Sequence, residues 1–331
     1  MALRLIEIVL PEKDGAELRE LLKAHELLEH RQIRLVDEEV LVRILLDAEQ
    51  LEAVLDLLGS RYTNKDGKRV VILPVEATLP RAEQAPAAEP EQAKPEEKSP
   101  ERIAREELYE DIKDAAYCSR VYLAMVALST IVAAIGLYYN SVAIIIGAMV
   151  IAPLLGPNMA MALATTLGDL PLLWRALKTS VAGTGTVMAL SVILGVVLQV
   201  DPALPEVASR NGVALGDVVV ALASGAAGAL AFTTGVSATL IGVMVAVALL
   251  PPLVTFGLLL GSGHLVMASG ALSLFLMNLI CINLAGVTTF LVQGIRPASW
   301  LEKDRAAKAT RISIMLWGVL LAALIGLILV L

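Results

Sequence analysis

The sequence is poor in the residues that carry most enzyme chemistry and nucleic-acid binding. It has two cysteines and three histidines in 331 residues, and aromatic side chains make up only 4 % of the chain. Cys118 and Cys281 lie far apart in sequence and are more typical of apolar packing than of a disulfide or a metal pair. No basic tract or series of stacking aromatic residues occurs, so we expect no nucleic-acid partner.

Catalytic and metal-binding motifs are missing as well. The chain contains no HExxH, GxSxG or Walker sequence. His25 and His30 are five residues apart in a charged segment, which is typical of a solvated helix surface, and His264 falls in a predicted loop. We therefore predict that the protein is not an enzyme and that it has no cofactor and no metal site.

Apolar residues, by contrast, are abundant. Hydrophobic side chains make up 57 % of the chain and the mean hydropathy is +0.73, which is too apolar for an ordinary soluble domain. Seven segments have about the 20 residues that a bilayer requires. The predicted spans are Val121–Tyr139, Val142–Thr166, Thr179–Val200, Asp217–Phe232, Val236–Leu260, Leu265–Val292 and Ile312–Leu331. The sequence thus predicts an integral membrane protein with the lipid bilayer as a partner.

Charged residues are absent from the middle of these segments. Asp169 and Asp217 lie at span edges, and the net charge of -7 comes from outside the spans. A proton relay through intramembrane carboxylates is therefore not indicated. Lys and Arg cluster before the first span, between the second and third, and between the sixth and seventh, so alternation places all three clusters on one side. By the positive-inside rule we expect a multi-pass protein of the inner (plasma) membrane with a cytoplasmic N-terminus.

Residues 1–77 have a different pattern, in which short apolar runs alternate with amphipathic stretches. Strands are predicted at Leu3–Leu10, Ile33–Val36, Val40–Leu46 and Arg69–Val75, and helices at Gly15–Glu29 and Ala48–Leu58. This βαββαβ order predicts a cytoplasmic α+β domain of the ferredoxin-like plan. Residues 78–107 predict a flexible linker rich in Pro, Glu and Ala, with a helix starting near Glu101 that continues into the membrane domain, 108–331.

The apolar half contains an internal repeat at an offset of 95 residues. Ser141–Pro157 reads SVAIIIGAMVIAPLLGP and Val236–Pro252 reads VSATLIGVMVAVALLPP. Eight of the seventeen pairs are identical, where about two are expected by chance in such an apolar alphabet. The identical pairs are Ala143/Ala238, Ile146/Ile241, Gly147/Gly242, Met149/Met244, Val150/Val245, Leu154/Leu249, Leu155/Leu250 and Pro157/Pro252. Three crossings separate the copies, so an α-helical polytopic domain with an inverted three-helix repeat is predicted, over about 121–200 and 216–292, with 312–331 as an extra helix.

Both copies contain prolines within a span, and these predict two broken helices. A proline cannot donate to the carbonyl four residues earlier, so each copy presents free carbonyls at corresponding places. Simple kinks are the alternative interpretation. Buried amides of the sixth span are further candidates because they are costly to bury. The predicted solute-binding residues are Met149, Pro153, Gly156, Pro157, Asn158, Val247, Ala248, Pro251, Pro252, Thr255, Asn278 and Asn283.

Three segments together resemble the bacterial and archaeal membrane family known as domain of unknown function 389. They are the stretch from Asn140 to Asn158, the second copy GVSATLIGVMVAVALLPPL, and PVEATLPR at Pro74–Arg81. The resemblance implies a soluble N-terminal domain fused to a polytopic membrane domain. It implies no particular substrate or activity.

Three functional hypotheses follow. The first is a transporter or channel-like protein whose pathway for a small solute or ion passes the two broken helices, regulated or assembled by the soluble domain as a homo-oligomer. The second is a membrane-anchored sensor whose soluble domain binds a small ligand or partner. The third is a structural assembly protein. Transport predicts a hydrated cavity between the second and fifth spans, whereas a sensor predicts packed prolines and a pocket within residues 1–77.

Overall fold

The computed structural model divides the chain into two compact units, Met1–Arg105 and Glu106–Leu331. It describes residues 3–25, 27–63, 68–75, 78, 103–234 and 238–295 and the single positions 315, 319, 322 and 326, with side chains omitted at 235–247. Most of the predicted linker and of the predicted span 312–331 lies outside these residues.

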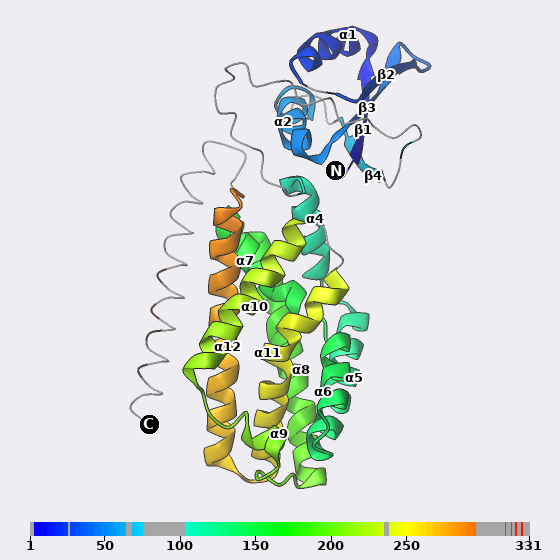
Figure 1. The fold of residues 1–331 in the computed structure, drawn as a ribbon. Coiled ribbons are helices and arrows are strands. Elements are labelled where there is room, and N and C mark those ends of the chain that lie inside the picture. The colour runs from blue at the N-terminus through cyan, green and yellow to red at the C-terminus, as the bar shows by residue number, and fades with distance from the viewer. Residues whose placement is uncertain are drawn as a thin grey trace. The chain divides into compact units, whose positions relative to one another are not determined.

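The first unit is a four-stranded antiparallel sheet with two helices, and it confirms the predicted βαββαβ order (Figure 1). The strand order across the sheet is β2-β3-β1-β4. Its elements are β1 (Leu3–Pro11), α1 (Glu12–Leu21), the short 3-10 turn Leu22–Ala24, β2 (Glu29–Arg34), β3 (Glu39–Asp47), α2 (Ala48–Leu58), a π-helical turn at Gly59–Thr63 and β4 (Val70–Val75).

One face of the sheet forms the core of this unit. Side chains alternate between the two faces of a strand, and the even-numbered residues of β1 and β3 are fully buried against α1 and α2. The main contributors are Ile6, Ile8, Leu10, Val42, Ile44 and Leu46 from the strands and Leu18, Leu51, Val54 and Leu58 from the helices. Each such side chain stabilises the fold by about 1.5–3 kcal/mol through burial.

The sequence misplaced two boundaries in this unit. The predicted helix Gly15–Glu29 ends at Leu21, and the second strand is Glu29–Arg34, upstream of the predicted 33–36. The strand has the sequence EHRQIR, is largely exposed and lies at the sheet edge. Its polar sequence has no strand periodicity because neither face is deeply buried. The predicted turn at Asp37 and Glu38 is confirmed, and both residues have positive φ, as a tight hairpin requires.

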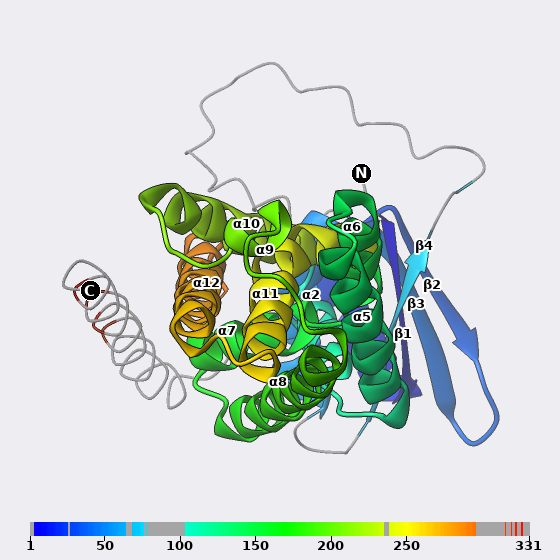
Figure 2. The same cartoon turned by 90° about the horizontal axis from the view of Figure 1, so that it is seen from below.

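The second unit is a bundle of helices (Figures 1 and 2). Figure 2 shows α11 in the middle of the bundle, where it contacts α8, α12, α10, α6 and α5. Its helices are α4 (Arg105–Ala115), α5 (Arg120–Tyr138), α6 (Val142–Ile151), α7 (Leu155–Leu167), α8 (Leu170–Leu198), α9 (Pro205–Ala208), α10 (Leu215–Thr233), α11 (Ala238–Gly261) and α12 (Leu265–Val292).

Four of these helices are long and apolar enough to cross a membrane, namely α5, α8, α10 and α12. The bent pair α6 and α7 adds a fifth if it is counted as one span. Two details differ from the sequence predictions. α4 ends at Ala115 and is separated from α5, so it does not continue into the membrane. α8 begins at Leu170, well before Thr179, because Arg175 and Lys178 belong to its first turns.

The helix boundaries repeat at the 95-residue offset found in the sequence. α5 and α10 begin at Arg120 and Leu215 and both have 19 residues, while α8 and α12 begin at Leu170 and Leu265. The turn between the second and third helices repeats too. Gly168 and Gly263 both have positive φ, and the backbone bond from Asp169 N to Ala164 O has its counterpart from His264 N to Leu259 O.

The packing repeats at the same offset. α8 packs against α11, and their counterparts α12 and α7 also pack together. Within the first contact, Gly257 lies directly against Ser191, so that a methyl group on the glycine would collide with the serine side chain. The corresponding positions are Ala162 and Gly286, where a Cβ on the glycine would lie 2.9 Å from the alanine Cβ. Equivalent pairs thus form the close approach in both halves.

Candidate functional site

The first predicted break lies between α6 and α7. Ala152 has an extended ψ of 116°, and the two helices are bent by 52° across the break. The cause is local. The ring of Pro153 disfavours the helical conformation of the preceding residue, and Pro153 has no N–H to donate to the carbonyl of Met149. The prediction of a broken helix is confirmed here.

The second predicted break, at Pro251 and Pro252, is wrong. Both prolines lie inside α11, which is one continuous helix from Ala238 to Gly261. Pro252 removes the backbone donor to the carbonyl of Ala248, and the side-chain amide of Asn278 replaces it, donating to that oxygen at 2.6 Å. Asn278 of α12 thus satisfies the carbonyl that Pro252 leaves free, and α11 stays continuous through both prolines.

Two further amides connect the two halves of the unit. Asn158 on α7 and Asn283 on α12 are both buried, and Asn283 Nδ2 donates to Asn158 Oδ1 at 3.1 Å. Asn158 Nδ2 donates to the Leu154 carbonyl at 2.8 Å, immediately after the break. Asn283 Nδ2 also donates to the Leu279 carbonyl at 2.9 Å. The helix break is thus joined through side-chain amides to the opposite half.

Two buried oxygens near the prolines and amides have no hydrogen-bond partner among the described residues. They are Asn283 Oδ1 and Thr255 Oγ1, and both side chains are fully buried. An unsatisfied buried oxygen costs about 1–3 kcal/mol, so such atoms are uncommon where only stability matters. They are available to accept a hydrogen bond from water or from a polar solute.

A small cavity lies beside the break. Its volume is ≈ 10 Å³, which is about the room that one water molecule needs. The lining comes from α5, α7, α8, α11, α12 and the residue preceding α7, and it has polar groups from both amide and hydroxyl side chains. The lining residues are Tyr122, Leu154, Pro157, Asn158, Ser180, Thr184, Leu249, Leu253, Phe275 and Leu279.

The predicted site residues are brought together only in part. Pro157 and Asn158 line the cavity, Asn283 binds Asn158, and Asn278 binds the Ala248 carbonyl at a separate place. None of the others lines this cavity. Met149, Pro251, Pro252 and Thr255 are buried in helix packing, Pro153 is half-buried, and the Val247 side chain is outside the described residues.

Gly156 is not part of the cavity lining and lies against the end of α4. A Cβ at this position would lie 2.6 Å from the carbonyl oxygen of Ala115, the last residue of α4. The end of α4 is held from the other side by Thr179, whose Oγ1 donates to the Ala116 carbonyl at 2.8 Å. Gly156 therefore allows α4 to pack against the break.

The family described as Domain of unknown function (DUF389) matches residues 149–284. An uncharacterized protein of Methanocaldococcus jannaschii is 38 % identical over 287 residues, which are 87 % of this chain and 87 % of that protein. The chain belongs to the DUF389 family. No solved structure matches it.

The DUF389 match runs from α6 to α12 and contains both the helix break and the three buried amides. Sequence reasoning found the amides and the prolines but missed Tyr122, Ser180 and Thr184 as parts of the cavity wall. Each of these is a common residue at a span surface, so no local signal distinguishes it. Among the described residues, no group of three or more His, Cys, Asp or Glu side chains is placed to hold a metal ion.

Proposed function

We propose that this DUF389 membrane protein is a transporter or channel-like protein whose solute pathway passes the α6–α7 break. The observation that carries the proposal is the contact between Asn158 and Asn283. It places an uncharged polar cluster beside interrupted backbone, deep in an apolar bundle, and leaves Asn283 Oδ1 without a partner among the described residues. Interrupted helices and buried polar side chains at a repeat interface are typical of transporters.

The repeated helix boundaries and the equivalent glycine contacts support an inverted repeat as the architecture of the pathway. In this proposal α5, α6–α7 and α8 form one half, and α10, α11 and α12 form the other in opposite orientation. With 312–331 the chain would cross the membrane seven times, with the N-terminal unit in the cytoplasm. The Asn158–Asn283 bond then joins the two halves at the pseudo-two-fold interface.

The chemistry of the cluster limits the solute. Amide and hydroxyl oxygens line the cavity and no carboxylate, ammonium or guanidinium does. Such a site suits a small neutral polar molecule or a monovalent cation, because a multivalent ion would need opposite charge to offset its desolvation. A cavity of ≈ 10 Å³ holds about one water molecule, so the described conformation is a closed one.

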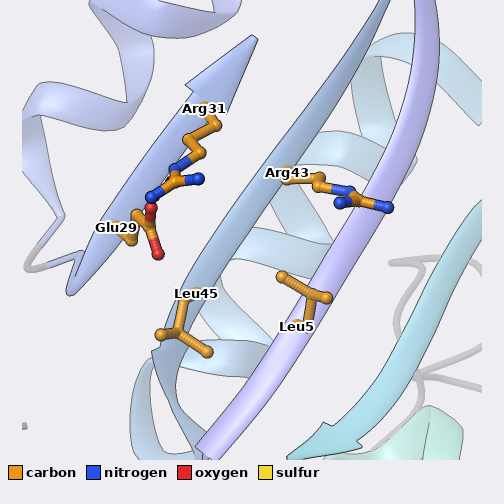
Figure 3. A pocket seen from close by; sticks show the side chains of 5 residues that line it. All are labelled: Leu5, Glu29, Arg31, Arg43 and Leu45. Carbon is orange, nitrogen blue, oxygen red and sulfur yellow. Dashed lines mark ion pairs between the residues drawn. The ribbon is translucent and has the colours of Figure 1, made fainter. Parts of the chain in front are cut away.

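The sensor hypothesis receives less support from the soluble unit. The hollow described there has a volume of ≈ 200 Å³, and it lies open on the sheet surface between Leu5, Glu29, Arg31, Arg43 and Leu45 (Figure 3). Ligand sites are usually concave and bury most of the ligand surface.

Flux measurements with the full chain in liposomes test the proposal. Potassium ions, water and glycerol serve as probes, and empty liposomes give the background. We expect at least one probe to cross faster than background, and Asn283→Leu to abolish this flux. Thr288→Val on the same helix is the control, because its hydroxyl bonds only to carbonyls of α12. Full flux in a folded Asn283→Leu protein would contradict the proposed pathway.

A further inference from the structure

The sheet of the first unit has a second face that no described element of that unit covers. We call it the open face. It consists of the odd-numbered side chains of the four strands, opposite the buried core. These are Leu3, Leu5, Glu7, Val9 and Pro11 of β1, Glu29, Arg31 and Ile33 of β2, Glu39, Leu41, Arg43, Leu45 and Asp47 of β3, and Val71, Leu73 and Val75 of β4.

The open face is too apolar for a surface that only meets water. Antiparallel sheets usually alternate apolar side chains toward the core with polar side chains toward solvent. Here ten of the sixteen side chains are Leu, Val, Ile or Pro, and Ile33, Val71 and Leu73 are 43 %, 45 % and 41 % exposed. Exposed apolar side chains gathered on one face of a folded unit are typical of an interaction site.

Strand register arranges these side chains in rows across the sheet. Leu45 pairs with Leu5, and Leu5 with Leu73, which forms an apolar row that ends at Glu29 on β2. The next row is charged, because Arg31 pairs with Arg43 and Arg43 with Glu7. The third row is apolar again, with Ile33, Leu41 and Val9. A charged row thus lies between two apolar rows.

We propose that the open face binds the open face of a second copy of this chain. The two-fold axis lies between the two facing sheets, runs parallel to the strands and passes between β1 and β3. It places β1 of one copy over β3 of the other and leaves each row at the same position along the strands. Arg43 of one copy then faces Glu7 of the other, and Leu45 faces Leu5, twice each. The two central strands are therefore self-complementary in charge and in apolar pattern, as a two-fold interface requires. The outer strands form the rim, where β2 faces β4 and Glu29 lies opposite Leu73 and Arg31 opposite Val71.

Charge balance distinguishes a second copy from other occupants. The face has two arginines and four carboxylates, those of Glu7, Glu29, Glu39 and Asp47. Within the chain Arg43 Nε lies 2.7 Å from Glu7 Oε1, and Arg31 pairs with Glu29. A nucleic acid or an anionic lipid surface requires an excess of positive charge, which this face lacks. Figure 3 shows Leu5 and Leu45 flanking the hollow, where the leucines of a second copy would fit.

Cross-linking of the full chain tests this interface. Two differently tagged populations are co-expressed in a Cys118→Ser background, since Cys118 is exposed and Cys281 is buried. One carries Leu5→Cys and the other Leu45→Cys. We expect a short bismaleimide to join the two tags, whereas Lys13→Cys in both populations, on the exposed side of α1, gives only background.

Charge reversal gives a second, independent measurement. Arg43→Glu places like charges opposite each other and should lower the yield of mixed-tag product about tenfold or more. Arg43→Glu in one population and Glu7→Arg in the other restore opposite charges between the two copies, although each chain keeps a like-charged pair in place of Arg43–Glu7. These complementary reversals should restore the yield of the mixed-tag product. The proposal is overturned if the Leu5/Leu45 yield equals that of Lys13→Cys, or if the complementary reversals fail to restore the yield in folded protein.

Discussion

Buried amide side chains of the membrane unit satisfy a backbone carbonyl that a proline leaves free, and they connect the two halves of the unit. Asn278 supplies the hydrogen bond that Pro252 removes from the Ala248 carbonyl, and Asn158 and Asn283 bind each other across the two halves. A single amide donor of this kind contributes little net stability when paired, but the group that it satisfies is costly to leave unpaired. The first prediction concerns this asymmetry.

We expect Asn278→Ala to lower the free energy of unfolding by about 1–3 kcal/mol, because the Ala248 carbonyl is then buried without a donor. Pro252→Ala restores a backbone N–H to the same carbonyl. In that background Asn278→Ala should cost less, by about 1 kcal/mol, which a double-mutant cycle measures directly. Equal costs in both backgrounds would show that Asn278 acts only by filling space.

At the scale of elements, the bent α6–α7 segment contains two glycines in contrasting surroundings. A Cβ on Gly156 would lie 2.6 Å from the Ala115 carbonyl oxygen of α4, whereas a Cβ on Gly147 would meet nothing within 4 Å. The same substitution should therefore have opposite effects within one segment, which makes the two positions a matched pair.

We predict that Gly156→Ala destabilises the protein by about 1–3 kcal/mol through overpacking against backbone. Gly147→Ala, by contrast, should be neutral or stabilising by up to about 1 kcal/mol, since alanine is the better helix former. Thermal unfolding of the two variants in the same detergent measures the difference. A neutral Gly156→Ala would show that α4 is not held against the break.

At the scale of the whole membrane unit, the proposed duplication is testable through its equivalent contacts. Ser191 and Gly257 form the close approach of α8 and α11, and Gly286 and Ala162 form that of α12 and α7. The second pair places the glycine on the other helix. Moving the glycine of the first pair from α11 to α8, with alanine in its place on α11, should therefore reproduce the packing of the second pair.

We expect Gly257→Ala alone to cost about 1–3 kcal/mol, because its methyl group collides with Ser191. Ser191→Gly with Gly257→Ala should recover most of that loss, as measured by unfolding in detergent. If the double variant is no more stable than Gly257→Ala, the two contacts are not interchangeable and the duplication argument loses its packing support.

The orientation of the unit is a further prediction at this scale. The Lys and Arg clusters predict that the loop after α8 lies outside the cell, so a cysteine at Pro202 should react with an impermeant maleimide applied to intact cells. A cysteine at Lys303 should react only after lysis. The reverse labelling pattern would place the N-terminal unit on the other side of the membrane.

Local rules explain what the sequence determined by itself. Periodicity determined the βαββαβ order, since strand and helix patterns depend on neighbouring residues. Hydropathy predicted the apolar helices. The 95-residue offset between the two sequence copies predicted that their helix boundaries would match. The break at Pro153 was also predictable, because the proline ring acts on the preceding residue and on its own missing N–H.

Contacts between distant residues were decided only by the tertiary structure. Pro251 and Pro252 have the same local chemistry as Pro153, yet α11 continues, and Asn278, which lies 30 positions beyond Ala248, still reaches its carbonyl. The bond between Asn158 and Asn283 joins residues 125 positions apart. The exposed strand β2 was misplaced because it has no buried face to impose a pattern. A proline determines which hydrogen bond is lost, but only packing determines whether another group replaces it.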